Sequence, residues 1–152
     1  HVGSKENPFV DNCNIILYGE RNSMAIVYDN AVEAGNKVLA NINVVKMYGK
    51  ARNQTMTRLL LPALKGSKSF NVEKGLDIVP GDRLALLATS YENMASDDVI
   101  VETYDAVTGL VTVAKKLNFY HWGAQKSPGA KFGGADMRGE VIMLTRNIKI
   151  IG

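Results

Sequence analysis

Short apolar runs rich in β-branched residues recur along the whole chain, with turn residues between them. Runs of about five residues have the usual length of a β-strand with one or both faces buried. Segments with helical spacing are few and short, so the pattern predicts an all-β chain. The runs are 15–18, 24–28, 38–45, 69–72, 84–87, 99–104, 110–113, 141–144 and 148–151.

One pair of runs predicts an antiparallel hairpin. Residues 99–104 and 110–114 flank the loop 105–109, whose length and Gly109 are typical of such a connection. The other runs are joined by unequal connections without hairpin loops. Strands that are apolar on both faces and are joined by unequal connections are typical of a solenoid, in which the strands stack in parallel. A sandwich or a barrel fits the same periodicity, so the pattern leaves the architecture open.

Composition indicates an ordinary globular chain. It has 152 residues, of which 46% are hydrophobic and 22% charged, which argues against disorder. No apolar stretch approaches the ~20 residues of a membrane-spanning helix, so no span is expected. A net charge of +3 mildly favours polyanions but falls short of a nucleic-acid-binding surface. The chain begins with His1 and shows no signal peptide, so we expect a piece of a longer protein.

Neither the single cysteine nor the acidic residues predict a metal centre. Cys13 alone excludes an internal disulfide and a cysteine-based zinc cluster. It is either a small buried hydrophobe or half of a disulfide to a residue outside this segment. Glu92, Asp97 and Asp98 gather carboxylates, yet their spacing lacks the EF-hand pattern and its glycine. A solvated turn is the preferred interpretation, with calcium as the alternative, and no cofactor is expected.

Several motifs, taken in order, resemble the glycine-rich G-eight domain and the parallel β-helix that follows it. This architecture occurs in fibrocystin-like receptors. It also occurs in the cell-surface hyaluronidases and the cell-migration-inducing hyaluronidases. The most specific is the closing Glu-Val-x-x-Leu-Thr-Arg-Asn-Ile, and Met56 stands where the family usually has tryptophan. The other motifs are His-Val-Gly-Ser at 1–4 and the segments 8–9, 14–19, 45–52, 55–59, 80–84 and 116–121.

The resemblance implies a right-handed parallel β-helix with the 99–114 hairpin as an excursion from its coils. Residues 1–60 would be the later part of a G-eight domain, and 61–152 continuing coils of the same structural unit. The segment would belong to a larger extracellular or cell-surface protein. Open coil ends predict that copies can stack end to end into filaments.

Hydrolytic members of the family need a histidine, an arginine and aspartates, and the resemblance implies His1, Arg21 and Asp29 for these roles. A carboxylate or imidazole could act as general acid or base, while the arginine holds a sugar carboxylate. Glycosidases usually need a second carboxylate, and the nearby acidic residues lack motif support. The alternative interpretation of 21–30 is a capped turn at a strand end, and we prefer it.

Two further segments carry candidate binding or modification residues. Asn53 begins the only Asn-x-Ser/Thr sequon and is a glycan acceptor if the protein is extracellular. The glycine-rich stretch 123–139 holds Lys126, Lys131 and Arg138, which predict an anion-binding loop, although it lacks the Walker pattern. A long loop without a ligand is the simpler interpretation. Trp122, next to Tyr120 and His121, could stack on a glycan.

We therefore expect a non-catalytic extracellular module of a large surface or secreted glycoprotein that binds glycan or protein partners. The competing hypothesis is a hyaluronan-cleaving glycoside hydrolase that uses His1, Arg21 and Asp29. The two differ in geometry, because the hydrolase requires these side chains to converge on one open groove.

Overall fold

The computed structural model describes residues 1–20, 22–23, 26–28, 32–35, 37–41, 43–92, 94–123 and 136–152. The chain divides into two compact units. His1–Ala51 and Arg146–Gly152 form one, here called the terminal unit, and Arg52–Thr145 form the other, the inserted unit. The chain thus leaves the terminal unit once and returns to it. The predicted domain boundary at residue 60 stays a prediction.

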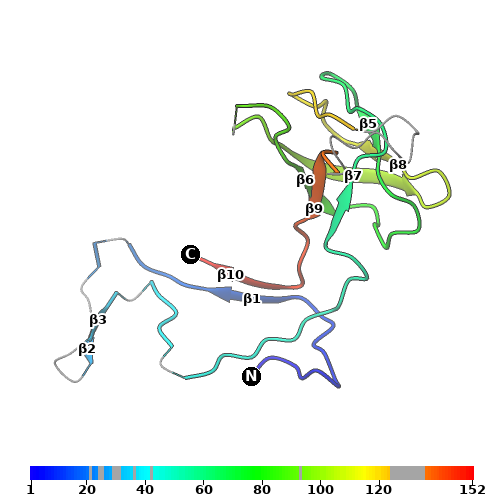
Figure 1. Ribbon diagram of the computed structural model, residues 1–152. Helices are drawn as coiled ribbons and strands as arrows, with labels where there is room; N and C mark the ends of the chain where they lie inside the picture. Colours follow the sequence, from blue (N-terminus) through cyan, green and yellow to red (C-terminus); the bar gives the residue numbers. More distant parts are fainter. Residues whose placement is uncertain are drawn as a thin grey trace. The chain divides into compact units, whose positions relative to one another are not determined.

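The inserted unit is built on a six-stranded antiparallel sheet with the order β4-β9-β6-β7-β8-β5 (Figure 1). The sheet curls into a half-barrel, and its two edges meet at one end through an antiparallel bridge between Leu59 and Val72. The strands are β4 (Met56–Arg58), β5 (Ser69–Asn71), β6 (Arg83–Leu86), β7 (Asp97–Asp105), β8 (Leu110–Val113) and β9 (Glu140–Met143).

The core lies on the concave side of this sheet. Alternate residues of β6 and β7 are buried and exposed in turn, so each strand gives one face to the core and the other to solvent. The core side chains include Leu59, Phe70, Val72, Leu84, Leu86, Val99, Val101, Val111, Val113, Val141 and Met143. An apolar interior of this size supplies the main stabilisation of the unit.

The predicted hairpin is confirmed as β7 and β8. Asp105 closes its turn by accepting hydrogen bonds from the Val107 amide (2.9 Å) and the Thr108 hydroxyl (2.6 Å). Gly109 has a φ of 76°, and a Cβ there would lie 2.1 Å from the Val72 carbonyl oxygen. Only glycine combines that backbone conformation with so close an approach.

The all-β prediction is confirmed, but the parallel β-helix prediction is wrong for the inserted unit. Every strand pair in that unit is antiparallel, and the hairpin is part of the sheet and not an excursion from coils. The error has a physical cause. Strands with one buried and one solvated face suit an antiparallel sheet, whereas stacked parallel strands need cover on both faces.

The terminal unit contains a parallel pair and a short hairpin. β1 (Cys13–Ile16) pairs in parallel with β10 (Ile148–Ile151), and β2 (Ile26–Tyr28) pairs antiparallel with β3 (Val32–Ala34). Single parallel bridges also join Val2 to Met47 and Phe9 to Gly49. These pairs do not make a stack of coils in the described residues, and end-to-end stacking of copies stays a prediction.

Candidate functional site

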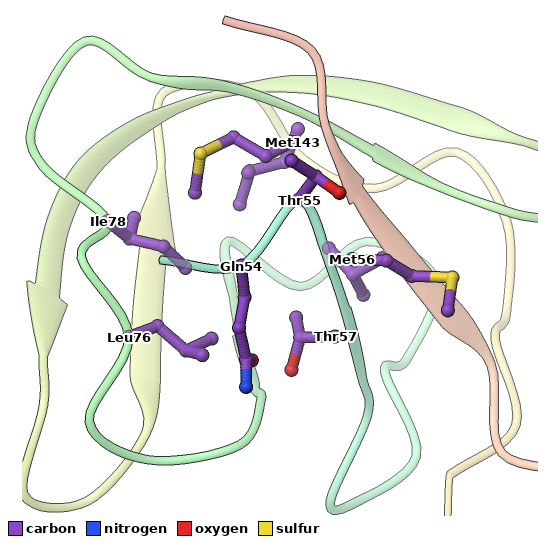
Figure 2. Close-up of a pocket in the computed structure, with 9 residues that line it drawn as sticks. Gln54, Thr55, Met56, Thr57, Leu76, Ile78 and Met143 are labelled. Carbon is purple, nitrogen blue, oxygen red and sulfur yellow. The ribbon is translucent and has the colours of Figure 1, made fainter. Parts of the chain in front are cut away.

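A small apolar pocket opens beside β4, lined also by residues of β6 and β9 and by Leu76 and Ile78 (Figure 2). Leu76, Ile78 and Met143 line it, and in this view the Gln54 side chain lies between Leu76 and Thr57. Its free volume of about 10 Å³ has room for a single water molecule. This pocket is therefore an incompletely filled end of the core and not a ligand site.

A larger groove of about 360 Å³ opens where β4 ends and β9 begins. This volume lies in the range of small-ligand sites. We call it the arginine groove, because two arginines, Arg58 and Arg138, line it. The remaining lining residues are Leu87, Ala88, Thr89, Asp136, Met137, Gly139 and Glu140.

Arg58 is positioned by the register of the sheet. It lies directly opposite Glu140 in the β4–β9 pair, and its Nη2 donates to Glu140 Oε1 at 2.8 Å. Its Nη1 donates to the carbonyl oxygens of Asp136 and Arg138, both at 3.0 Å. One guanidinium therefore holds both the carboxylate of the facing strand and the backbone that leads into that strand.

Arg138 is held by two carboxylates. Its Nε and Nη2 donate to Asp136 at 2.9 and 2.7 Å, and Nη2 also contacts Glu73 Oε1 at 3.2 Å. The hydrogen bonds from Arg138 keep the pKa of Asp136 far below its usual value, and the same contact raises the pKa of Arg138. Asp136 and Arg138 thus stay charged across the neutral pH range. Any anion that binds Arg138 must compete with Asp136.

Trp122 borders this groove through its backbone. Its amide donates to Thr89 Oγ1 at 2.9 Å, and its carbonyl accepts from the Gly139 amide at 2.8 Å. Tyr120 and Trp122 flank His121, which is buried. Side chains alternate in an extended segment, so Tyr120 and Trp122 lie on the face opposite the His121 ring. The trio is therefore split between the core and the surface.

His121 and Asp97 form a buried hydrogen-bonded pair that no local pattern in the sequence predicts. Its Nε2 lies 3.0 Å from Asp97 Oδ2 and its Nδ1 lies 2.9 Å from the Leu87 carbonyl oxygen. The Leu87 carbonyl can only accept, so Nδ1 donates to it, and Nε2 faces the Asp97 carboxylate. The Asn118 and Phe119 amides also donate to the Asp97 carboxylate, at 2.8 and 3.0 Å. Since Leu87 lines the arginine groove, this pair anchors part of its wall.

Burial opposes the charge of Asp97, but hydrogen bonds from His121, Asn118 and Phe119 outweigh it and lower the pKa of Asp97. Asp98 faces the opposite side of β7, where Arg83 binds it through Nε at 2.7 Å. Two of the three acidic residues considered for calcium therefore already pair with separate basic side chains, His121 and Arg83. Among the described residues, no group of three potential metal ligands comes together.

The described part of the structure does not test whether the three predicted hydrolase residues lie close together. His1 is exposed in the terminal unit, while Arg21 and Asp29 lie outside the described residues. Lys126 and Lys131 of the predicted anion-binding loop also lie outside them. The hydrolase geometry and the role of that loop remain predictions. Within the described part of the chain, no helix is both long and apolar enough to cross a membrane.

The predicted glycan acceptor and the cysteine lie in different units. Asn53 is exposed at the start of the inserted unit, and its backbone amide donates to Asp77 Oδ2 at 3.0 Å. Cys13 is a half-buried free thiol on β1. The terminal unit also has a groove of about 410 Å³, lined by Lys50 and Arg146 together with apolar Met47, Ile148 and Ile150.

Comparison with known proteins identifies the first part of the chain. Residues 1–60 match the family described as the G8 domain, as the motif resemblance predicted. Fibrocystin-L of Mus musculus is 23% identical over 150 residues, covering 99% of this chain and 4% of that protein. A G8 domain-containing protein of Dictyostelium discoideum is also 23% identical, covering 97% of this chain and 12% of that protein.

The chain therefore spans a small fraction of the length of these relatives. Among solved structures, a match is found to the tailspike of Acinetobacter baumannii bacteriophage AP22, which was solved in complex with a capsular saccharide. The match covers 64% of this chain and 15% of the tailspike chain, with a TM-score of 0.43 and 18% sequence identity. That likeness is too weak to support a conclusion about fold or function.

Proposed function

We propose that this chain is a non-catalytic, extracellular carbohydrate-binding module that holds its ligand in the arginine groove. The observation that carries the proposal is the groove itself, with planar guanidinium and carboxylate groups fixed around about 360 Å³. Such sites combine a few fixed polar groups with an apolar wall. Here Leu87, Ala88 and Met137 provide that wall.

The groove is suited to binding and poorly suited to glycoside cleavage. A glycosidase needs a carboxylic acid that stays protonated near neutral pH, which requires a raised pKa. Asp136 has the opposite property, because its pKa is well below normal. The hyaluronan-cleaving alternative would instead use His1, Arg21 and Asp29 in the terminal unit. Depolymerisation of hyaluronan by the chain, lost in an Asp29→Ala variant, would favour that alternative.

The extracellular placement is supported by the similarity to fibrocystin-L and by the exposed sequon at Asn53. We therefore propose that Asn53 carries an N-linked glycan. Its exposed side chain leaves room for a glycan without unfolding of the inserted unit.

A glycan array tests the binding function, with Ala88→Phe as the blocking variant. Ala88 lines the groove and makes no charged contact, so a phenyl ring there fills space without removing a charge. The matched control is Ala114→Phe, at an exposed position just after β8. We expect the parent chain and the control to bind the same glycans and Ala88→Phe to lose them. A folded parent chain that binds no glycan would contradict the proposal.

A further inference from the structure

We infer that the arginine groove selects neutral, hydroxyl-rich saccharides and discriminates against polyanionic ones. This inference rests on the proposed carbohydrate-binding function and specifies its ligand class. It is drawn from two features of the groove, the balance of its charges and the kind of hydrogen-bonding group that it leaves accessible.

The charges that line the groove cancel. Arg58 and Arg138 face Asp136 and Glu140, which gives two positive and two negative groups. Glu73, which contacts Arg138, adds a further negative charge behind them. A sulfate or carboxylate that enters must therefore approach carboxylates as closely as guanidiniums. The described residues that line the groove therefore sum to no net positive charge that would attract a polyanion, although the whole chain carries a formal charge of +3.

The accessible polar groups are mainly acceptors. The Asp136 and Glu140 side chains are 37% and 36% exposed, whereas those of Arg58 and Arg138 are 26% and 19% exposed. Arg58 already uses Nη1 and Nη2 on internal partners, and Arg138 uses Nε and Nη2. Ionised carboxylates only accept hydrogen bonds. A ligand must therefore bring donors, as sugar hydroxyls do. A sulfate or carboxylate group placed beside Asp136 or Glu140 offers no donor and meets a like charge, so the anionic groups of a polyanionic saccharide oppose binding here even though its hydroxyls do not.

A cationic ligand also brings donors, but in the groove it must approach the guanidiniums of Arg58 and Arg138, which repel it. A neutral sugar meets no such repulsion, and it can donate to Asp136 and Glu140 and lay the C–H face of its ring against Leu87 and Met137. Binding of this kind should depend little on salt, because screening acts on net charge interactions.

The test is a binding titration of the full 152-residue chain against neutral mannan, dextran and chitohexaose, anionic hyaluronan and heparin, and cationic polylysine. Only binding that Ala88→Phe abolishes is assigned to the groove. We expect such binding for at least one neutral saccharide, with less than a twofold change in affinity between low and physiological salt.

Glu140→Gln tests the charge balance directly. The substitution keeps the size of the side chain, removes an acceptor charge and leaves Arg58 with the more distant Asp136 carboxylate, 3.7 Å from its Nε. We expect affinity for the neutral saccharide to fall about tenfold, the usual scale for losing a charged hydrogen bond. Groove binding of hyaluronan should appear, and it should weaken with added salt. Glu102→Gln, an exposed position on β7, makes the same change in net charge and should alter neither property.

The outcomes separate this inference from the proposed function. Groove binding of hyaluronan, heparin or polylysine in preference to every neutral saccharide would overturn the selectivity and leave the binding function standing. Unchanged neutral affinity in a folded Glu140→Gln variant, checked by its thermal midpoint, would also overturn it. Absence of any binding that Ala88→Phe removes would overturn both.

Discussion

Gly49 lies directly against the side chain of Asn147, so closely that an added Cβ would be 2.4 Å from Asn147 Oδ1. The space is needed because that oxygen accepts the Lys50 amide at 2.9 Å. The Nδ2 of the Asn147 side chain donates to the carbonyl oxygens of Phe9 and Asp11, at 2.7 and 2.8 Å. Asn147 thus joins three segments of the terminal unit, which explains why an asparagine stands in the closing motif.

We expect Asn147→Ala to loosen the terminal unit selectively. Losing three hydrogen bonds should cost about 2–3 kcal/mol. Gly49→Ala should also loosen the terminal unit, because the added Cβ would displace the side-chain amide of Asn147. Hydrogen exchange at the Lys50 and Cys13 amides measures this, with exchange in β7 and β8 unchanged. Asn12→Ala, at an exposed position, is the control, and equal effects of the two asparagine variants would contradict the role of Asn147.

Asp97→Asn should destabilise the inserted unit strongly, because it replaces a buried carboxylate that His121, Asn118 and Phe119 all contact by hydrogen bonds. Breaking a buried pair from one side typically costs about 3–5 kcal/mol. The neighbouring Asp98→Asn breaks only the solvent-exposed pair with Arg83 and should change stability little. Urea denaturation of both variants gives the comparison. Similar midpoints for the two would show that the buried pair contributes no more than the surface one.

The stabilisation from Asp97 should disappear in acid. Its folded-state pKa is lowered, so its contribution is complete above the unfolded value of about 3.9 and is lost as pH falls through the folded value. The difference in thermal midpoint between the parent chain and Asp97→Asn should be constant from about pH 5 to 6 and should shrink below about pH 4. A difference that grows toward low pH would have the wrong sign for this explanation.

Gly109→Ala should destabilise the inserted unit more than Gly75→Ala. Both glycines have positive φ, 76° and 72°, but a Cβ at Gly75 would meet nothing within 4 Å. Gly75→Ala should therefore show the backbone cost alone, about 1–2 kcal/mol. Gly109→Ala must also displace the Val72 carbonyl at the closure of the half-barrel. Equal losses in free energy of unfolding would show that the hairpin turn absorbs the clash.

Expression in a mammalian secretory system tests the proposed glycan at Asn53. We expect one electrophoretic shift that glycosidase treatment removes, and the same loss in Asn53→Gln and Thr55→Ala. Thr57→Ala, two residues beyond the sequon, should keep the shift. A secreted chain without any shift would contradict the proposed modification.

Local patterns were sufficient for some of these features. The β-branched runs predicted an all-β chain, and residues 105–109 predicted the hairpin, because a turn and its flanking strands are close in sequence. The motifs at the start of the chain predicted the G8 domain. Periodicity did not decide between parallel and antiparallel pairing, and the resemblance led to a β-helix where β4, β6 and β9 pair antiparallel.

The sequence by itself determined the all-β class, where the hairpin turns and which family the first residues match, since each depends on neighbouring residues or on motif order. It did not determine every strand, because β3 (Val32–Ala34) and β4 (Met56–Arg58) were not among the predicted runs, and the described residues of 38–45 form no strand. Only the tertiary structure decided that the buried His121 meets Asp97 and that Arg58 meets Glu140. Their partners are 24 and 82 residues away along the chain. Such contacts arise when the sheet brings distant strands into register, and no local pattern records that pairing.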